Sequence, residues 1–300
     1  MHALITGGTG FIGRNLVKRL AKPVVLGRDP ERIRRELGDV EANRWDARSP
    51  LDPDLFTGID TVFHLAGEPI ASGRWDTEKK ERIRKSRVEG TRLLVDALGR
   101  TAAPPATLIC ASAIGFYGSR GDEILSESSP AGHDFLAGVC GEWEEEAKRA
   151  ERFGVRVVSL RIGVVLGPDG GALEKMLPPF RFGLGGRLGS GRQYMSWIHR
   201  DDLVGLLLHA ADNETLHGPV NAVAPQPVTN REFTATLARV LHRPALLPVP
   251  AFILKMALGE FADVLLGSQR VIPEKAQKAG FHFAHQRLDE TLAGLVAAPP

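Results

Sequence analysis

Thr6-Gly7-Gly8-Thr9-Gly10-Phe11-Ile12-Gly13 is the stretch that decides the fold of this 300-residue chain. It follows the apolar run 3–6, an expected strand, and opens an expected helix near 10–20. Glycines at these spacings permit a tight turn at Gly7, close approach of a phosphate at Gly10 and close packing of helix on strand at Gly13. The free N–H groups at the start of the helix favour a pyrophosphate. The pattern therefore predicts a dinucleotide site formed by Gly7, Thr9, Gly10, Phe11, Ile12 and Gly13.

Apolar runs alternate with amphipathic stretches through the first half of the chain. Strands are expected at 24–26, 59–65, 107–111 and 155–160. Helices are expected at 31–37, 78–98 and 142–153. This alternation is typical of a parallel sheet covered by helices on both faces. We therefore expect an α/β fold, a Rossmann doubly wound parallel sheet with a smaller C-terminal α/β domain that binds substrate.

The character of the chain changes after Gly163. Segment 183–191 holds five glycines in nine residues, too many for a regular element. A capping box, Thr229-Asn230-Arg231-Glu232, predicts a helix that continues to about Leu241. We expect residues 1–165 and about 196–225 to form the dinucleotide-binding Rossmann domain, and about 166–195 and 226–300 to form the substrate domain.

Composition excludes several classes of protein. The 38 basic and 36 acidic residues give a net charge of +2, so the global charge favours neither nucleic acid nor a membrane. Two cysteines, Cys110 and Cys140, cannot form a disulfide framework, and no apolar run approaches the roughly 18 residues that span a bilayer. His282 and His285 have no accompanying cluster of metal ligands. We expect a cytoplasmic protein with a small-molecule substrate and no metal site.

The residues after the second expected strand bear on the choice between NAD and NADP. NAD-specific sites place an acidic residue there to bind the ribose hydroxyls. Here the position is Gly27, and Arg28 follows it. A neutral residue followed by arginine leaves room for a 2′-phosphate and supplies a planar cation to bind it, which favours NADP. Two alternatives stay open: Asp29 reaches the ribose instead, or Arg28 is a solvated surface residue.

Motifs spread along the chain carry a family resemblance. The first group is the glycine stretch with Trp45-Asp46, His64-Leu65-Ala66-Gly67, Trp197-Ile198-His199 and Asp201-Asp202. With these the chain resembles the extended short-chain dehydrogenase/reductases. More narrowly, it is similar to an atypical group described as sugar-nucleotide epimerase-like or cell-division-inhibitor-like. The stretches shared with that group are Arg74-Trp75, Ser86-Arg87-Val88, Gly163–Gly167, Gly185-Gly186, Ser268–Val271 and Pro273.

The resemblance implies further cofactor contacts. Asp46 is expected to reach the adenine amine, and Leu65, Ala66 and Gly67 to line the cofactor. Arg87 stands where classical members carry an asparagine and is expected to contact the cofactor. Five residues leave Arg82 only about 140° from it on a helix, so the two share a face, unless both are surface residues. Arg161, at the end of a strand, is expected in the ligand crevice, where it binds the cofactor or a substrate phosphate, or else forms a structural ion pair.

Classical members of this family use a tyrosine and a lysine four residues later. This chain has two tyrosines, and neither Tyr117 nor Tyr194 has a lysine at that spacing. In the corresponding segment, the resemblance places Leu136 in the tyrosine position and Cys140 in the lysine position. The departure puts ordinary reductase or epimerase chemistry in doubt.

Three residues are candidates to replace the missing pair. Ser112 matches the third catalytic position of the family approximately and is expected to orient a substrate oxygen. Tyr117, Cys140 or a water is expected to move the proton, and a thiol beside cofactor or arginine charge is expected to titrate near neutral pH. The alternatives are a hydroxyl that caps a strand end for Ser112, packing for Tyr117 and a small buried helix residue for Cys140.

Two functions remain in competition. The first is an NADP-binding oxidoreductase or epimerase-like enzyme acting on a sugar nucleotide or another small polar metabolite. The second is a catalytically silent NADP-binding regulatory protein that acts through a protein partner. The absent tyrosine–lysine pair favours the second, and the intact cleft favours the first. Because extended members often dimerise through a four-helix contact, a homodimer through the helix at 78–98 is also expected.

Overall fold

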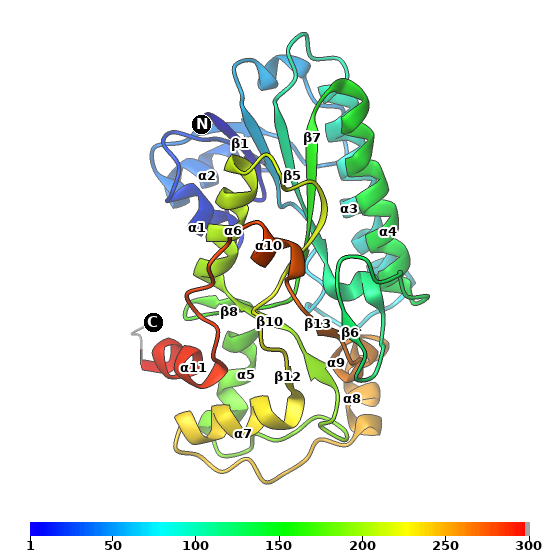
Figure 1. The fold of residues 1–300 in the computed structure, drawn as a ribbon, viewed down its shortest axis with the longest axis vertical. Helices are drawn as coiled ribbons and strands as arrows, with labels where there is room; N and C mark the ends of the chain where they lie inside the picture. Colours follow the sequence, from blue (N-terminus) through cyan, green and yellow to red (C-terminus); the bar gives the residue numbers. More distant parts are fainter. Residues whose placement is uncertain (298–300) are drawn as a thin grey trace.

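The core of the fold is a sheet of seven parallel strands, in a computed structural model that describes residues 1–297 (Figure 1). Its order is β11-β7-β5-β4-β1-β2-β3, and every neighbouring pair is parallel. The order reverses between β1 and β4, where open α/β sheets bind their ligands. The expected doubly wound α/β fold is confirmed. The strands are β1 (Ala3–Thr6), β2 (Val24–Gly27), β3 (Glu41–Arg44), β4 (Thr61–His64), β5 (Thr107–Ala113), β7 (Arg156–Ile162) and β11 (Gly218–Ala222).

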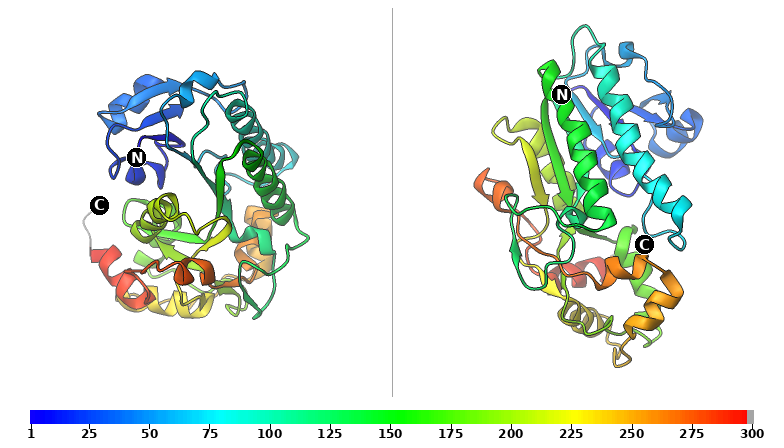
Figure 2. Two further views of the ribbon diagram at one scale, coloured as in Figure 1. Left: turned by 45° about the horizontal axis from the view of Figure 1, so that its top comes forward. Right: turned by 90° about the vertical axis from the view of Figure 1, so that its right-hand side faces the viewer.

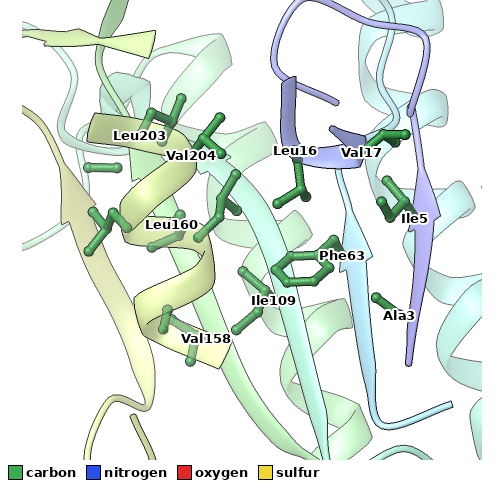
Figure 3. Close-up of a cluster of buried hydrophobic side chains, with 14 of the residues drawn as sticks. Ala3, Ile5, Leu16, Val17, Phe63, Ile109, Val158, Leu160, Leu203 and Val204 are labelled. Atoms are coloured by element: carbon green, nitrogen blue, oxygen red, sulfur yellow. The ribbon is translucent and has the colours of Figure 1, made fainter. Parts of the chain in front are cut away.

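Successive side chains of a strand point to opposite faces of a sheet, and here they are apolar on both faces. Helices therefore cover both faces. Ala3 and Ile5 of β1 lie in one cluster (Figure 3). Leu4 lies in the other. The first face is covered by α1 (Gly13–Val17), α2 (Pro30–Leu37) and α6 (Arg200–Asp212). The second is covered by α3 (Thr77–Leu98) and α4 (Phe135–Lys148), which lie side by side in Figure 2.

A second body of structure lies beyond the carboxyl edge of the sheet. It has its own core cluster, which includes Leu173, Trp197, Phe233 and Leu292. The capping box at Thr229 is present and opens α7. The division into two domains at the expected boundaries stays a prediction. The elements here are β8 (Val164–Gly167), α5 (Gly171–Arg181), β9 (Tyr194–Met195), β10 (Trp197–His199), β12 (Val228–Thr229), α7 (Asn230–Val240) and α11 (Leu288–Ala297).

Smaller elements connect the two bodies. They are β6 (Ile124–Leu125), α8 (Ala251–Leu258), α9 (Phe261–Leu266), β13 (Arg270–Val271) and α10 (Glu274–Lys278). Single 3₁₀ turns occur at Pro53–Phe56, Ile114–Tyr117 and Arg149–Phe153. Within residues 1–297, no helix combines the length and the apolar character needed to cross a bilayer.

Two helix boundaries differ from the sequence expectation. The helix expected near 10–20 is shorter, because residues up to Ile12 form the turn that precedes α1. The helix expected at 142–153 begins at Phe135, where Asp134 caps it by accepting a hydrogen bond from the Ala137 amide. It tightens into a 3₁₀ turn after Lys148. The earlier start places Leu136 and Cys140 on the same helix.

Candidate functional site

The glycine turn between β1 and α1 has no room for larger residues. Gly7 has a φ of +74°, and a Cβ on it would lie 2.8 Å from the Leu65 carbonyl. A Cβ on Gly13 would lie 2.2 Å from the Gly7 oxygen, so helix and strand meet at this point. Among the described residues, the amides of Phe11 and Ile12 have no hydrogen-bond acceptor. Free amides at a helix start form the cradle that a pyrophosphate requires, so the residues present fit a dinucleotide.

The side chain of Phe11 fixes this turn against the second body. Its ring lies 2.6–2.7 Å from the Cβ positions that Gly167, Gly170 and Gly171 lack, so only glycines fit beneath it. The guanidinium groups of Arg14 and Arg200 lie 5.8 and 5.9 Å from the ring centre, and both pair with Asp169. The Phe11 side chain is thus used in packing, while its backbone amide has no acceptor among the described residues.

The end of β4 is held by a buried hydrogen-bond network. Thr6 Oγ1 lies 2.7 Å from His64 Nδ1 and accepts from the Ala66 amide at 3.2 Å. His64 Nε2 lies 3.0 Å from Thr91 Oγ1, and burial lowers the pKa of His64 to about 4, so the ring is neutral near neutral pH. The network positions Leu65, Ala66 and Gly67 at the carboxyl edge beside the glycine turn. The sequence had offered His64 only as part of a motif.

At the other side of the turn, Arg28 and Asp46 leave adjacent strands at the same edge. Arg28 is exposed and forms no salt bridge with the described residues. Asp29 caps α2, with Oδ1 accepting from the Arg32 amide at 3.0 Å. Asp46 Oδ1 accepts from the Arg48 and Ser49 amides, and the bond from Arg48 contributes most to lowering the pKa of this carboxyl. Asp29, the residue that would compete for the ribose, thus has one carboxylate oxygen occupied by the helix cap. The Arg28 guanidinium has no such partner among the described residues.

The two arginines expected on α3 differ in their surroundings. The Arg87 guanidinium lies 3.4 Å from the Cβ position that Gly67 lacks, and it donates to the Glu68 carbonyl at 3.1 Å. Burial lowers the pKa of Arg87. Arg82 pairs instead with Glu78, and its Nε lies 3.8 Å from the Glu68 carboxylate. Of the two, Arg87 is therefore the one that adjoins the predicted cofactor-lining segment.

A buried ion pair beside Arg87 was missed by sequence reasoning. Lys79 Nζ lies 2.7 Å from Glu68 Oε1, and the lysine side chain is only 4% exposed. The hydrogen bond from Lys79 is the largest cause of the lowered pKa of Glu68. Lys79 stands in the charged first turn of α3 and had the pattern of a solvated helix start. Glu68 contacts Lys79 only because of the path that the loop after β4 takes.

Ser112, Tyr117 and Arg161 are brought together, but they face one another inside the protein. Tyr117 donates its hydroxyl to Asn221 Oδ1 at 2.7 Å and accepts from Arg161 Nη1 at 3.0 Å. Arg161 Nε and Nη2 donate to the Glu144 carboxylate at 2.8 and 2.7 Å. Ser112 Oγ donates to the same carboxylate at 2.7 Å. Arg161 therefore forms the structural ion pair that was the alternative to a crevice contact.

Glu144 and Asn221 are the members of this network that the sequence did not single out. Glu144 lies on α4 two turns after Leu136, and Asn221 lies on β11. The Ser112 hydroxyl and the Tyr117 hydroxyl are each committed to a buried partner. Their roles in orienting a substrate oxygen or moving a proton stay predictions, since either role would require these bonds to open.

The expectation that Cys140 titrates near neutral pH is wrong for this structure. Burial raises the pKa of the thiol to about 12, and the nearby Glu144 carboxylate adds to that rise. Burial also raises the pKa of Tyr117. Gly115 lies over both Leu136 and Cys140, with its missing Cβ position 3.8 Å from the sulfur. Cys140 therefore has the character of a small buried helix residue, the alternative stated for it above.

No group of three or more potential metal ligands occurs among residues 1–297. His285 stacks on His199 with 3.6 Å between ring centres, and its Nδ1 lies 3.3 Å from the buried Asp202 carboxylate. His199 accepts a hydrogen bond from the Asp201 amide and caps α6. These histidines fasten the start of α6 to the segment before α11.

Comparison with family models and curated proteins gives consistent matches. The model of the NAD dependent epimerase/dehydratase family matches residues 3–223, and a domain of unknown function, DUF1731, matches residues 249–295. Epimerase family protein Mb2239 of Mycobacterium bovis is 42% identical over 299 residues, which cover 98% of this chain and 97% of that protein. A chloroplastic epimerase family protein of Arabidopsis thaliana, a homolog of SDR39U1, is 40% identical and covers 99% of this chain and 87% of its own length.

Solved structures give the same fold. The crystal structure of human epimerase family protein SDR39U1 with NADPH has a TM-score of 0.87 and 34% identity, covering 98% of this chain and 99% of that one. A UDP-glucuronic acid 4-epimerase of Bacillus cereus, solved with NAD and a fluorinated UDP-sugar, has a TM-score of 0.79, with 98% of this chain and 97% of that chain covered. Its 18% identity supports a shared fold alone.

Proposed function

Because the chain belongs to the NAD dependent epimerase/dehydratase family, within the extended short-chain dehydrogenase/reductases, we propose that it is an NADP-binding oxidoreductase or epimerase-like enzyme. The proposed substrate is a sugar nucleotide or another small polar metabolite. The observation that carries the cofactor assignment is the glycine turn, where two amides and the nearby Arg28 have no partner within residues 1–297. The human relative crystallised with NADPH supports the choice of NADP.

The proposed cofactor contacts follow the carboxyl edge of the sheet. The turn from Gly7 to Gly13 would hold the pyrophosphate, and Arg28 the 2′-phosphate. Asp46, Leu65–Gly67 and Arg87 would line the remainder. When bound, the nicotinamide supplies or accepts a hydride. Arg82 and Arg161 are left out of this set, since both are engaged with carboxylates of the protein.

The chain itself contributes positioning of the reacting groups. Leu136 and the buried Cys140 stand where the family resemblance places the titrating groups of classical members. The loop that covers Leu136 and Cys140 is held by the buried hydrogen-bond network of Ser112, Tyr117, Arg161 and Glu144. We propose that water carries the proton, because the two hydroxyls are committed and the thiol stays protonated near neutral pH.

The alternative function, a catalytically silent NADP-binding regulatory protein, rests on the same network. Each side chain proposed to replace the tyrosine–lysine pair is buried and already bonded or protonated. Incubation with NADPH labelled with deuterium at C4, together with sugar nucleotides and small carbonyl compounds, separates the two. Label in any product supports the enzyme. NADPH binding with neither label transfer across a broad panel nor epimerisation of a sugar nucleotide by the NADP⁺-loaded protein supports the regulatory protein.

Replacing Arg28 by alanine is expected to weaken NADPH binding and to leave NADH binding unchanged. A charged hydrogen bond contributes about 1.5–3 kcal/mol, so the NADPH dissociation constant should rise roughly 10- to 100-fold. Titration followed by tryptophan fluorescence measures both cofactors. Arg35→Ala is the matched control, because Arg35 is exposed on α2 and forms no salt bridge within residues 1–297. Equal NADPH affinities of Arg28→Ala and the parent protein would remove the 2′-phosphate assignment.

A further inference from the structure

Exposed apolar side chains gather on one part of the second body. Seven of the ten large apolar residues that are exposed within residues 1–297 occur between residues 182 and 256. They belong to the loop after α5, the loop before α8, and α8 itself, and we call them the apolar patch: Phe182, Leu184, Leu246, Leu247, Phe252, Ile253 and Met256. Single exposed apolar residues are ordinary, whereas a gathered set marks an interaction surface.

The two loops that carry the patch are adjacent in space. The Val249 amide donates to the Arg187 carbonyl at 2.9 Å, and the Gly189 amide donates to the Val249 carbonyl at 2.9 Å. The missing Cβ position of Gly183 lies 3.6 Å from Pro244. In Figure 1 the loop between α7 and α8 runs along the lower end of the molecule into α8. Segments about 60 residues apart in sequence therefore form one surface.

Helix α8 presents an unpartnered apolar face. Phe252 and Met256 are 68% and 71% exposed and stand one turn apart, with Ile253 beside them. Leu254, on the opposite side, is the helix's buried residue. Lys255 borders the apolar face and pairs with Asp263 of α9. An apolar stripe is one feature of helices that lie in a membrane interface, and the cations of this surface come from the neighbouring segments of the chain.

The two segments that carry the patch are one-sided in charge, whereas Asp263 of the adjoining α9 already pairs with Lys255. Segments 178–192 and 239–256 contain six Arg and Lys residues and no Asp or Glu, although the whole chain is nearly balanced at 38 to 36. Five of these six cations form no salt bridge with the described residues: Arg181, Arg187, Arg192, Arg239 and Arg243. Two copies meeting through this surface would bring like charges together, so the charge opposes self-association and favours an anionic partner.

We propose that this surface docks on an anionic phospholipid bilayer, with the apolar patch entering the interface and the arginines at the level of the phosphates. Arginines near a negative leaflet add attraction for each charge. The proposal concerns peripheral attachment, is independent of the cofactor site and adds a partner to the proposed function.

The test is sedimentation of the NADPH-loaded protein with vesicles of phosphatidylcholine alone, or with part of it replaced by phosphatidylglycerol. Binding is expected only to the anionic vesicles. It should decline in 1 M salt, where the screening length falls from about 10 Å to about 3 Å. Phe252→Ser with Met256→Ser, and separately Arg181→Ser with Arg243→Ser, should each lower the partition coefficient at least about tenfold.

Matched controls replace an exposed apolar residue and an exposed arginine elsewhere. Ile124→Ser and Arg35→Ser should bind the vesicles like the parent protein, and all variants should keep their NADPH affinity as a sign of correct folding. Absence of binding to anionic vesicles would overturn the proposal, and so would binding that neither double variant weakens. A dimer in sedimentation velocity that Phe252→Ser with Met256→Ser dissolves, without vesicle binding, would assign the surface to a second copy.

Discussion

Replacing Gly13 by alanine is expected to abolish cofactor binding at accessible concentrations. The new Cβ would lie 2.2 Å from the Gly7 oxygen and 2.8 Å from the Gly8 Cα, and both are backbone atoms that no rotamer change can move. The start of α1 must shift away from β1, which separates the free amides of Phe11 and Ile12 from the turn. We expect NADPH affinity to fall at least about 100-fold, or about 2.7 kcal/mol, in calorimetric titration.

A second glycine separates loss of the cradle from loss of the fold. Gly10→Ala meets only the Gly7 oxygen, at 3.2 Å, so the protein should fold while the methyl group obstructs the phosphate. Gly138→Ala in α4 is the matched control, because no atom lies within 4 Å of the added methyl group. The assignment of this turn would be contradicted if Gly13→Ala bound NADPH within threefold of the Gly138→Ala control. It would also be contradicted if Gly10→Ala bound NADPH as tightly as that control.

Replacing Glu144 by alanine is expected to lower the free energy of unfolding more than any other substitution proposed for this protein. The Arg161 and Glu144 side chains are 4% and 13% exposed, so the variant leaves a guanidinium buried without its counter-charge. Breaking one side of a buried pair costs about 3–5 kcal/mol. For a chain of this size the melting temperature should fall by roughly 5–10 °C in calorimetry.

Two further variants test the physical reason. Glu142→Ala removes the partner of Arg84 from the solvent-exposed side of the same helix, and such pairs contribute only about 0–1 kcal/mol. Glu144→Leu combined with Arg161→Met removes both buried charges and should recover most of the lost stability. Equal melting temperatures for Glu144→Ala and Glu142→Ala, or a double variant as unstable as Glu144→Ala, would show that the pair is not the cause.

The sequence predicted the parts of the site that depend on local geometry. A strand, a glycine turn and a helix follow one another within 20 residues, and each glycine is required by a close approach within that unit. The capping box at Thr229 is equally local. Arg28 could be predicted as a cofactor contact because it follows the second strand of this unit, whereas the expectation for Asp46 came from the family resemblance.

Residues whose surroundings come from distant segments could not be predicted in the same way. Ser112 was expected to orient a substrate oxygen, but its hydroxyl donates to the Glu144 carboxylate. Cys140 was expected to titrate near neutral pH, but burial beneath the Gly115 loop raises the pKa of its thiol. The position of Arg161 at the end of a strand did not predict that its guanidinium would pair with the Glu144 carboxylate. Lys79 looked solvated because Glu68 lies eleven residues away along the chain.

By itself, the sequence determined a doubly wound sheet with a dinucleotide turn, because hydrophobic periodicity and glycine spacing act over a few residues. The tertiary structure alone decided which polar groups pair inside it and which arginines stay free on its surface. A hydrogen bond or an exposed patch depends on the distance between segments that are remote in the chain, and only packing of the whole fold sets that distance.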